Sequence, residues 1–146
     1  MRSYRTFLFL VLALMLAAFA SAQQILVLVN EKAVSFPDVQ PKEMAGRVMV
    51  PIRGVFERLG ATVKFDESDQ RVIIQQGEDE ITLKVGDDFA NKNGQVVYAK
   101  SKAVMIHGRV MVPLRFLSET LGARVEWIGA ERTVRISTSV TLVPPR

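Results

Sequence analysis

The sequence predicts an α+β fold that is mostly β: twisted antiparallel sheet with two short helices, built from two internal repeats. The stretch GRVMVPIRGVFERLGATV at residues 46–63 returns 62 residues later as GRVMVPLRFLSETLGARV. Comparing residues 46–74 with 108–136 gives 14 identities in 29 aligned positions, and a fixed period of this kind is typical of a repeated structural unit. Around both stretches, apolar and polar residues alternate between tight turns, as they do in β-strands.

Each copy is expected to begin with a β-hairpin. Residues 25–29 and 33–36 are rich in β-formers and flank a polar turn. In the second copy, residues 81–85 alternate cleanly, and an Asn-Gly pair begins the segment 93–98. Asn-Gly is the strongest two-residue signal for a hairpin.

The shared motif itself predicts a strand followed by a short helix. Residues 47–50 and 109–112 have strand character, and the proline after each suits a first helical turn, where no backbone N–H is needed. Residues 52–59 place apolar side chains at i, i+3, i+4 and i+7, and residues 114–121 repeat three of these places. A glycine follows each helix, as is common at helix ends. Helices of about eight residues are stable only when they pack against other elements.

A second hairpin follows each helix. In the first copy it consists of residues 62–65 and 71–75, and in the second of residues 124–127 and 133–137. The apolar residues alternate along all four segments. Each copy therefore reads as hairpin, strand, short helix and hairpin.

Residues 1–22 have the pattern of a secretory signal peptide. Two arginines precede an apolar run at residues 7–20, and small residues lead to its end. The run has 14 residues, whereas a membrane span needs about 20. We expect cleavage between Ala22 and Gln23, an extracytoplasmic location in the periplasm or at the cell surface, and no stable membrane insertion afterwards. An uncleaved anchor is the alternative.

The rest of the chain is expected to form one domain. It would cover residues 23–138 as two repeats, about 25–77 and 81–138, followed by a tail at residues 139–146. The chain contains no cysteine, so core packing must hold it together. A half of this length would be marginal alone, which predicts that the two copies share one core.

The charge balance does not favour a nucleic-acid partner. Loss of Arg2 and Arg5 with the signal peptide leaves 17 of the 19 basic residues against 15 acidic ones. The Lys and Arg residues are not clustered as a nucleic-acid footprint requires. We therefore expect no nucleic acid among the partners.

These motifs resemble the copper amine oxidase N-terminal domain family, the stalk modules found in many secreted bacterial proteins. The resemblance rests on the doubled Gly-Arg-Val-Met-Val-Pro-x-Arg, on LGATVKFD and LGARVEW, on ITLKVG and on Asn-Gly-Gln, and it covers about residues 25–136. It implies a twisted antiparallel sheet around a helix and a non-catalytic role. Two positions depart from the pattern: Glu31 stands where the family usually has glycine, and Gly54 is aligned with Phe116.

The sequence offers no catalytic or metal-binding set. A copper amine oxidase needs three histidines on copper and a tyrosine that becomes its cofactor, whereas this chain has one histidine, His107, and two tyrosines. His107 lies in an expected turn without a second ligand nearby, and no cysteine nucleophile exists. The acidic residues at 78–80 and 87–88 lack the spacing of a calcium loop. We expect no enzyme activity, no metal and no cofactor.

The candidate binding residues are four arginines and one aromatic: Arg47, Arg53, Arg109, Arg115 and Phe116. Arg53 and Arg115 fall at helix N-termini, where a cation opposes the macrodipole. Two explanations stay open. The guanidinium groups satisfy carbonyls or acidic turns while their stems cover apolar surface, or they form a shallow anion site for an acidic wall polymer or a partner carboxylate.

Phe116 lies two places before Ser118, which is aligned with Phe56. Two residues turn a helical side chain by about 200°, so Phe116 does not fill the place that Phe56 fills. It either packs inside the shared core or is an exposed contact residue.

Together these observations predict an exported, non-catalytic binding or assembly module of the cell envelope. Its partner would be a wall polymer or another exported protein. The alternative is a purely structural or self-associating stalk module.

Overall fold

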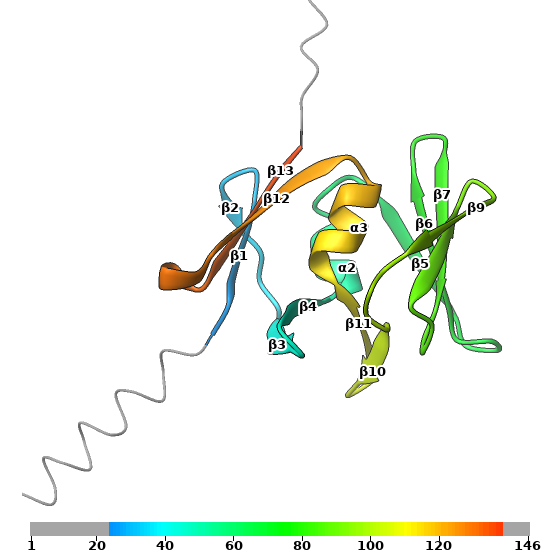
Figure 1. The fold of residues 1–146 in the computed structure, drawn as a ribbon, viewed down its shortest axis with the longest axis horizontal. Helices are drawn as coiled ribbons and strands as arrows, with labels where there is room; N and C mark the ends of the chain where they lie inside the picture. Colours follow the sequence, from blue (N-terminus) through cyan, green and yellow to red (C-terminus); the bar gives the residue numbers. More distant parts are fainter. Residues whose placement is uncertain (1–23, 139–146) are drawn as a thin grey trace, which may run out of the picture.

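The computed structural model describes residues 24–138, in which three β-sheets surround two short helices (Figure 1). The expected signal peptide and the expected tail lie outside the described residues. Sheet A lies at one end of the molecule, sheet C at the other, and sheet B and the helices lie between them. The structure is mostly β, with largely antiparallel sheets and two short helices, and this confirms the predicted fold class; the organisation as two repeats stays a prediction.

Sheet A joins the two ends of the described chain. Its strands, in the spatial order β12-β13-β1-β2, are β1 (Leu26–Val29), β2 (Lys32–Ala33), β12 (Ala123–Ile128) and β13 (Thr133–Thr138). A 3-10 turn, η2 (Gly129–Glu131), connects β12 with β13. The strands β1 and β13 pair in parallel, with Leu26 opposite Thr133. The side chain of Asn30 fastens this pair, since its Nδ2 donates to Thr138 Oγ1 at 3.0 Å and its Oδ1 accepts from Thr138 N at 3.0 Å.

Sheet C is a continuous antiparallel meander. Its strands, in sequence and spatial order, are β5 (Thr62–Asp66), β6 (Arg71–Gln76), β7 (Asp79–Lys84), β8 (Phe89–Lys92) and β9 (Gln95–Tyr98). The Asn-Gly turn was placed correctly, but its hairpin joins β8 and β9. The segment expected to open this hairpin is β7, which pairs with β6 and β8. The sequence analysis missed β8 because FANK has little β-character.

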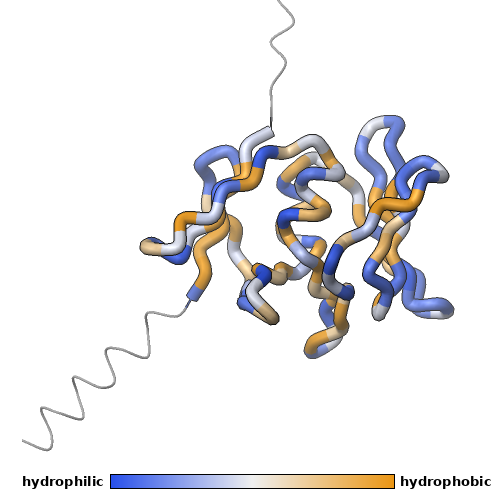
Figure 2. Tube along the Cα trace, viewed as in Figure 1, coloured by the Kyte–Doolittle hydropathy of each residue, from blue (hydrophilic) through white to orange (hydrophobic). Residues whose placement is uncertain are grey.

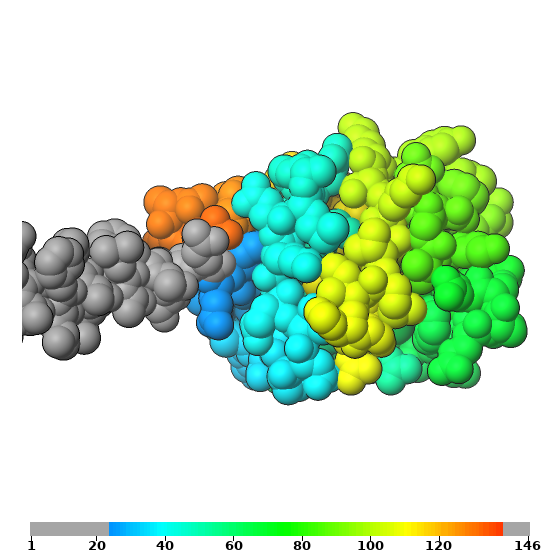
Figure 3. All heavy atoms as spheres, turned by 90° about the horizontal axis from the view of Figure 1, so that it is seen from below, coloured from blue at the N-terminus to red at the C-terminus, as the bar shows by residue number. Residues whose placement is uncertain are grey.

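Sheet B brings the two copies of the motif together. Its strands, in the order β10-β11-β4-β3, are β3 (Lys42–Met44), β4 (Arg47–Pro51), β10 (Val104–Ile106) and β11 (Arg109–Pro113). The motif strands β4 and β11 are antiparallel, and Val50 lies opposite Val112, the residue in the same place of the other copy. The strands β3 and β10 were not predicted. Seen from below, the hairpins β3–β4 (cyan) and β10–β11 (yellow) form the middle of the surface (Figure 3).

The helices α2 (Ile52–Phe56) and α3 (Leu114–Thr120) follow the motif strands and are shorter than expected. Both bury their apolar side chains in one hydrophobic cluster that extends along the chain from Ile25 to Ile136 and includes residues of both copies. Hydrophobic stretches alternate with hydrophilic turns along the trace (Figure 2). A second, small cluster on the other face of sheet B contains Met49 and Met111. Neighbouring residues of β4 thus face opposite sides of the sheet, with Val50 in the main cluster and Met49 in the small one.

Candidate functional site

Two hollows lie where sheet B and its helices meet sheets A and C. Hollow 1 has a volume of about 550 Å³, and hollow 2 about 400 Å³. The charged and aromatic residues that distinguish hollow 1 are Arg47, Tyr98, Lys100, Arg115, Phe116 and Trp127. The residues in the same places of hollow 2 are Arg109, Phe36, Asp38, Arg53, Gly54 and Phe65.

The two hollows are equivalent sites built from the two copies of the sequence. Thirteen of the sixteen residues that line hollow 1 have a counterpart in hollow 2 at a distance of 62 positions. This equivalence follows from sheet B, because the antiparallel pairing of β4 and β11 places each motif strand beside the helix of the other copy. Equivalent positions with different residues therefore show how the two hollows differ in charge and in shape.

The structure divides the five candidate residues between the hollows. Arg47, Arg115 and Phe116 line hollow 1, and Arg53 and Arg109 line hollow 2. Each hollow thus combines a strand arginine of one copy with the helix arginine of the other. This combination depends on the pairing of β4 with β11, which the sequence pattern did not predict.

In hollow 2 the strand arginine is neutralised. The guanidinium of Arg109 donates to Asp38 Oδ2 through Nε at 3.1 Å and through Nη2 at 2.5 Å. Both side chains are about half exposed, so this ion pair adds little to stability. The ion pair matters because it shows where a carboxylate binds the strand arginine, namely at Nε and Nη2.

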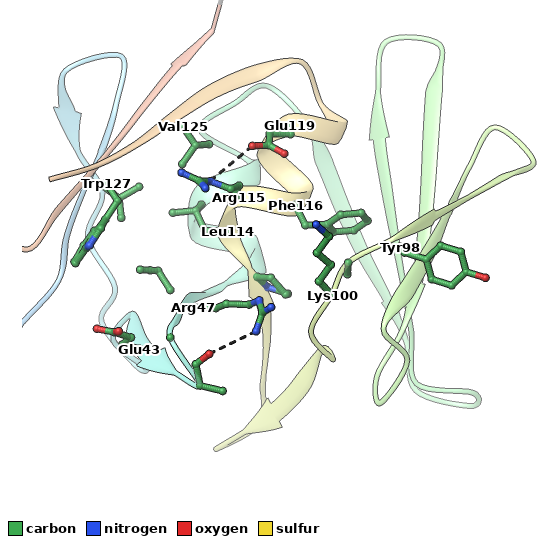
Figure 4. A pocket seen from close by; sticks show the side chains of 16 residues that line it. Glu43, Arg47, Tyr98, Lys100, Leu114, Arg115, Phe116, Glu119, Val125 and Trp127 are labelled. Carbon is green, nitrogen blue, oxygen red and sulfur yellow. Dashed lines mark hydrogen bonds and ion pairs between the residues drawn. The ribbon is translucent and has the colours of Figure 1, made fainter. Parts of the chain in front are cut away.

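In hollow 1 the charge at the same place is reversed. Lys100 replaces Asp38, and the guanidinium of Arg47 has only a 3.5 Å contact with the carbonyl of Ala45. Neither Arg47 nor Lys100 forms an ion pair with any residue between 24 and 138. Figure 4 shows that Arg47 turns toward the Ala45 carbonyl, whereas Lys100 extends toward α3.

The third cation of hollow 1 is only weakly paired. Arg115 lies 3.7 Å from Glu119 on the exposed side of α3, where a pair of this spacing contributes a few tenths of a kcal/mol. Glu43 also lines the hollow (Figure 4). Three cations and two carboxylates therefore surround hollow 1, and two of the cations lack an acidic partner among the described residues.

An exchange of aromatic residues opens hollow 1 further. In hollow 2 the ring of Phe36 lies on α2 at Gly54, where an added Cβ would come within 3.0 Å of Phe36 Cε1. The equivalent place on α3 carries Phe116, and Tyr98, the equivalent of Phe36, is 72% exposed. In hollow 1 the helix itself carries the aromatic, whereas in hollow 2 the aromatic comes from the segment after β2. This exchange accounts for the exposure of Tyr98.

Phe116 lies between the core and the surface, whereas its sequence position left core packing and an exposed contact as alternatives. It is partly buried and packs against the main core, and it also lines hollow 1. Ser118, at the place of Phe56, is fully buried, and its hydroxyl has no hydrogen-bond partner within residues 24–138. The second helix therefore uses a different ring, from a different face, to contact the core.

The sequence analysis missed three residues of hollow 1, namely Tyr98, Lys100 and Trp127. Trp127 lies on β12 at one side of the hollow and is 38% exposed. In the sequence it is one of the alternating apolar residues of segment 124–127 and carries no separate signal of a binding site. Lys100 could have been found by comparing the two copies outside the identical motif, because the 62-residue period aligns it with Asp38.

The residues do not fit a copper centre. His107, the chain's single histidine, is exposed in the turn between β10 and β11. The described part of the chain holds no group of three His, Cys, Asp or Glu side chains that could bind a metal ion. None of the helices between residues 24 and 138 has the length and hydropathy that a membrane crossing requires.

The carboxyl groups with shifted pKa values lie outside both hollows. The hydrogen bond from Asn93 and the ammonium of Lys92 lower the pKa of Asp79. Hydrogen bonds from the side chain and backbone of Ser68 lower the pKa of Asp66. Both groups stabilise turns of sheet C.

Comparison with known families gives one match. The family model described as copper amine oxidase N-terminal domain matches residues 28–136, which is most of the described chain. No protein among the curated ones is similar enough to match.

Proposed function

Because the chain belongs to the copper amine oxidase N-terminal domain family, we propose that it is an exported, non-catalytic binding module that acts at the cell envelope. This domain is a non-catalytic module of the copper amine oxidases. The signal-peptide pattern of residues 1–22 supports export to the periplasm or the cell surface. The ligand is a wall polymer or another exported protein.

The observation that carries this proposal is hollow 1. Its volume lies in the range of ordinary ligand sites, and it is lined by two cations without acidic partners among the described residues. A free cation on a surface is usually just solvated. Here the equivalent hollow 2 has its arginine neutralised by a carboxylate, so a carboxylate is compatible with this geometry.

The second candidate function, a self-associating stalk, is favoured by β9. This strand lies at the edge of sheet C and exposes Val96 and Tyr98, and Tyr98 makes an edge contact with Phe89 at a centroid distance of 6.4 Å. Exposed edge strands can pair with another chain. The strand has only four residues, which limits the area that such pairing could bury.

The two functions are distinguished by two measurements on the same purified protein, residues 23–146. It should co-sediment with purified peptidoglycan sacculi that retain their attached polymers, and light scattering should give the mass of a monomer. Binding that falls with added salt supports the proposal, because it rests on cations. A concentration-dependent dimer that does not bind the sacculi would favour the stalk.

A further inference from the structure

We propose that hollow 1 binds a carboxylate-bearing polysaccharide and that one ligand carboxylate lies between Arg47 and Lys100. This inference rests on the proposed function and names the ligand class of that site. The carboxylate would contact Arg47 as the carboxylate of Asp38 contacts Arg109 in hollow 2. The ion pair of Arg109 with Asp38 therefore serves as a structural template for the bound state of hollow 1.

The contacts between Asp38 and Arg109 define this template. The same oxygen of Asp38 accepts from Nε and Nη2 of Arg109, which shows that this edge of the strand arginine is open to a carboxylate. Arg47 is the equivalent arginine, and its strand β4 pairs with the strand of Arg109 at equivalent residues. The corresponding edge of Arg47 has no acidic partner within residues 24–138. Charge-assisted bonds of this kind are among the stronger hydrogen bonds in proteins.

Lys100 supplies a second charge at the same place. It stands where Asp38 stands in the other copy, so the hollow carries a cation where the equivalent site carries its own anion. Both cations line the same hollow without an acidic partner within residues 24–138, and an anion placed between them would be attracted by both. The exchange of one residue therefore changes a closed ion pair into an open anion site.

The aromatic residues around the cations favour a polysaccharide over a peptide. Trp127 of sheet A is exposed at one side of the hollow, whereas the exposed ring of Tyr98, on sheet C, points away from the other lining residues (Figure 4). Aromatic rings of this kind present a large apolar face together with a polar tip. The C–H faces of sugar rings can pack on such rings while acidic substituents reach the cations. Phe116 and Leu114 add an apolar wall between them.

The test uses the protein of residues 23–146 and oligomers of polygalacturonate, with calorimetric or fluorescence titration at low salt. Lys100→Asp reproduces the residue pattern of hollow 2 and should pair with Arg47. We expect it to weaken binding at least about tenfold, since a charge-assisted hydrogen bond is worth about 1.5–3 kcal/mol. Lys102→Asp changes the net charge equally, lies two residues away on the exposed surface and does not line the hollow. This control should bind like the wild type, and both variants should melt like the wild type.

Other outcomes would overturn the inference. Equal losses in Lys100→Asp and Lys102→Asp would show a diffuse charge effect without a site. Equal affinity for polyglutamate would exclude a polysaccharide as the ligand class, and equal affinity for the methyl ester of the oligomer would exclude the carboxylate. Wild-type protein that binds sacculi but no polygalacturonate contradicts this inference alone, whereas binding to neither contradicts the proposed function as well.

Discussion

Phe56 and Phe116 are the two helix aromatics, and they differ in how deeply they are buried. Phe56 is fully buried in the main cluster, whereas Phe116 is partly buried and borders hollow 1. We expect Phe56→Ala to lower the free energy of unfolding by about 3–5 kcal/mol. Phe116→Ala should cost clearly less, because one side of its ring already faces the hollow. Urea unfolding of the two variants compares these costs directly.

Equal losses in the two variants would contradict this assignment and would make Phe116 a core residue. A large loss of polygalacturonate affinity in Phe116→Ala, with nearly normal unfolding, would agree with its place in hollow 1. Phe56 and Phe116 also show which features of a side chain can be predicted from the sequence alone. The displacement of the ring to another helix face was readable from residue order, whereas its depth depended on the packing of sheet C and β12.

The turn between β8 and β9 is one element where pH should affect stability. Asn93 donates to Asp79 Oδ1 at 2.7 Å, and Lys92 lies 3.1 Å from Asp79 Oδ2 while it donates to the Thr120 carbonyl of α3 at 2.6 Å. This network connects β7 and β8 with the second helix. It depends on an ionised Asp79.

The pKa of Asp79 is lowered from its usual value of 3.8 by these contacts. A carboxyl group with a lowered pKa in the folded state stabilises the protein above the unfolded pKa, and this contribution is lost as the pH falls through the folded value. Urea unfolding between pH 7 and pH 2.5 should therefore show a flatter acid dependence in Asp79→Asn than in the wild type.

Glu78→Gln is the matched control, since Glu78 is the exposed neighbour in the same turn region. It should retain the wild-type pH dependence. Parallel pH profiles for the wild type and Asp79→Asn would contradict the role assigned to this network. Both carboxyl groups are solvent-accessible, so the effect is expected to be modest.

The elements differ in how far the sequence determines them. The motif strands, both helices and the hairpins β5–β6 and β12–β13 could be predicted, because each combines alternation with a proline or glycine at its boundary. The strands β3, β8 and β10 could not, since KEM, FANK and VMI are short and carry no alternating pattern of their own. Their strand conformation depends on neighbouring strands.

The candidate site was predictable only in part for the same reason. Arg47 and Arg115 belong to the repeated motif and attracted attention through their residue type. Their joint position in hollow 1 depends on the pairing of β4 with β11 and on the place of β12, which are contacts between residues far apart in sequence. Lys100 could be recognised from the 62-residue period, which aligns it with Asp38, whereas the place of Trp127 beside these arginines depends on the fold.

The whole molecule should not fold as two separate halves. The strand β1 pairs with β13 at the opposite end of the described chain, and one hydrophobic cluster includes residues of both copies. Protein segments of residues 23–77 and 78–146, expressed separately, should lack a cooperative thermal transition in circular dichroism. Each would expose apolar surface that the other covers.

A cooperative transition in either segment alone would show an independent domain and would contradict the shared core. Mixing the two segments provides the internal control. We expect the mixture to recover a common transition, since the parallel pairing of β1 with β13 and the pairing of β4 with β11 need both segments.

The equivalence of the two hollows permits a direct test of the binding site, by observing the arginine Nε resonances in nitrogen-15 NMR spectra during titration with polygalacturonate oligomers. In the wild type, we predict that the signal of Arg47 shifts and that of Arg109, already paired with Asp38, does not. In the double variant Asp38→Lys with Lys100→Asp, the shift should move to Arg109. Shifts of Arg109 in the wild type, or unchanged arginine signals in both proteins, would contradict the assignment of hollow 1 as the binding site.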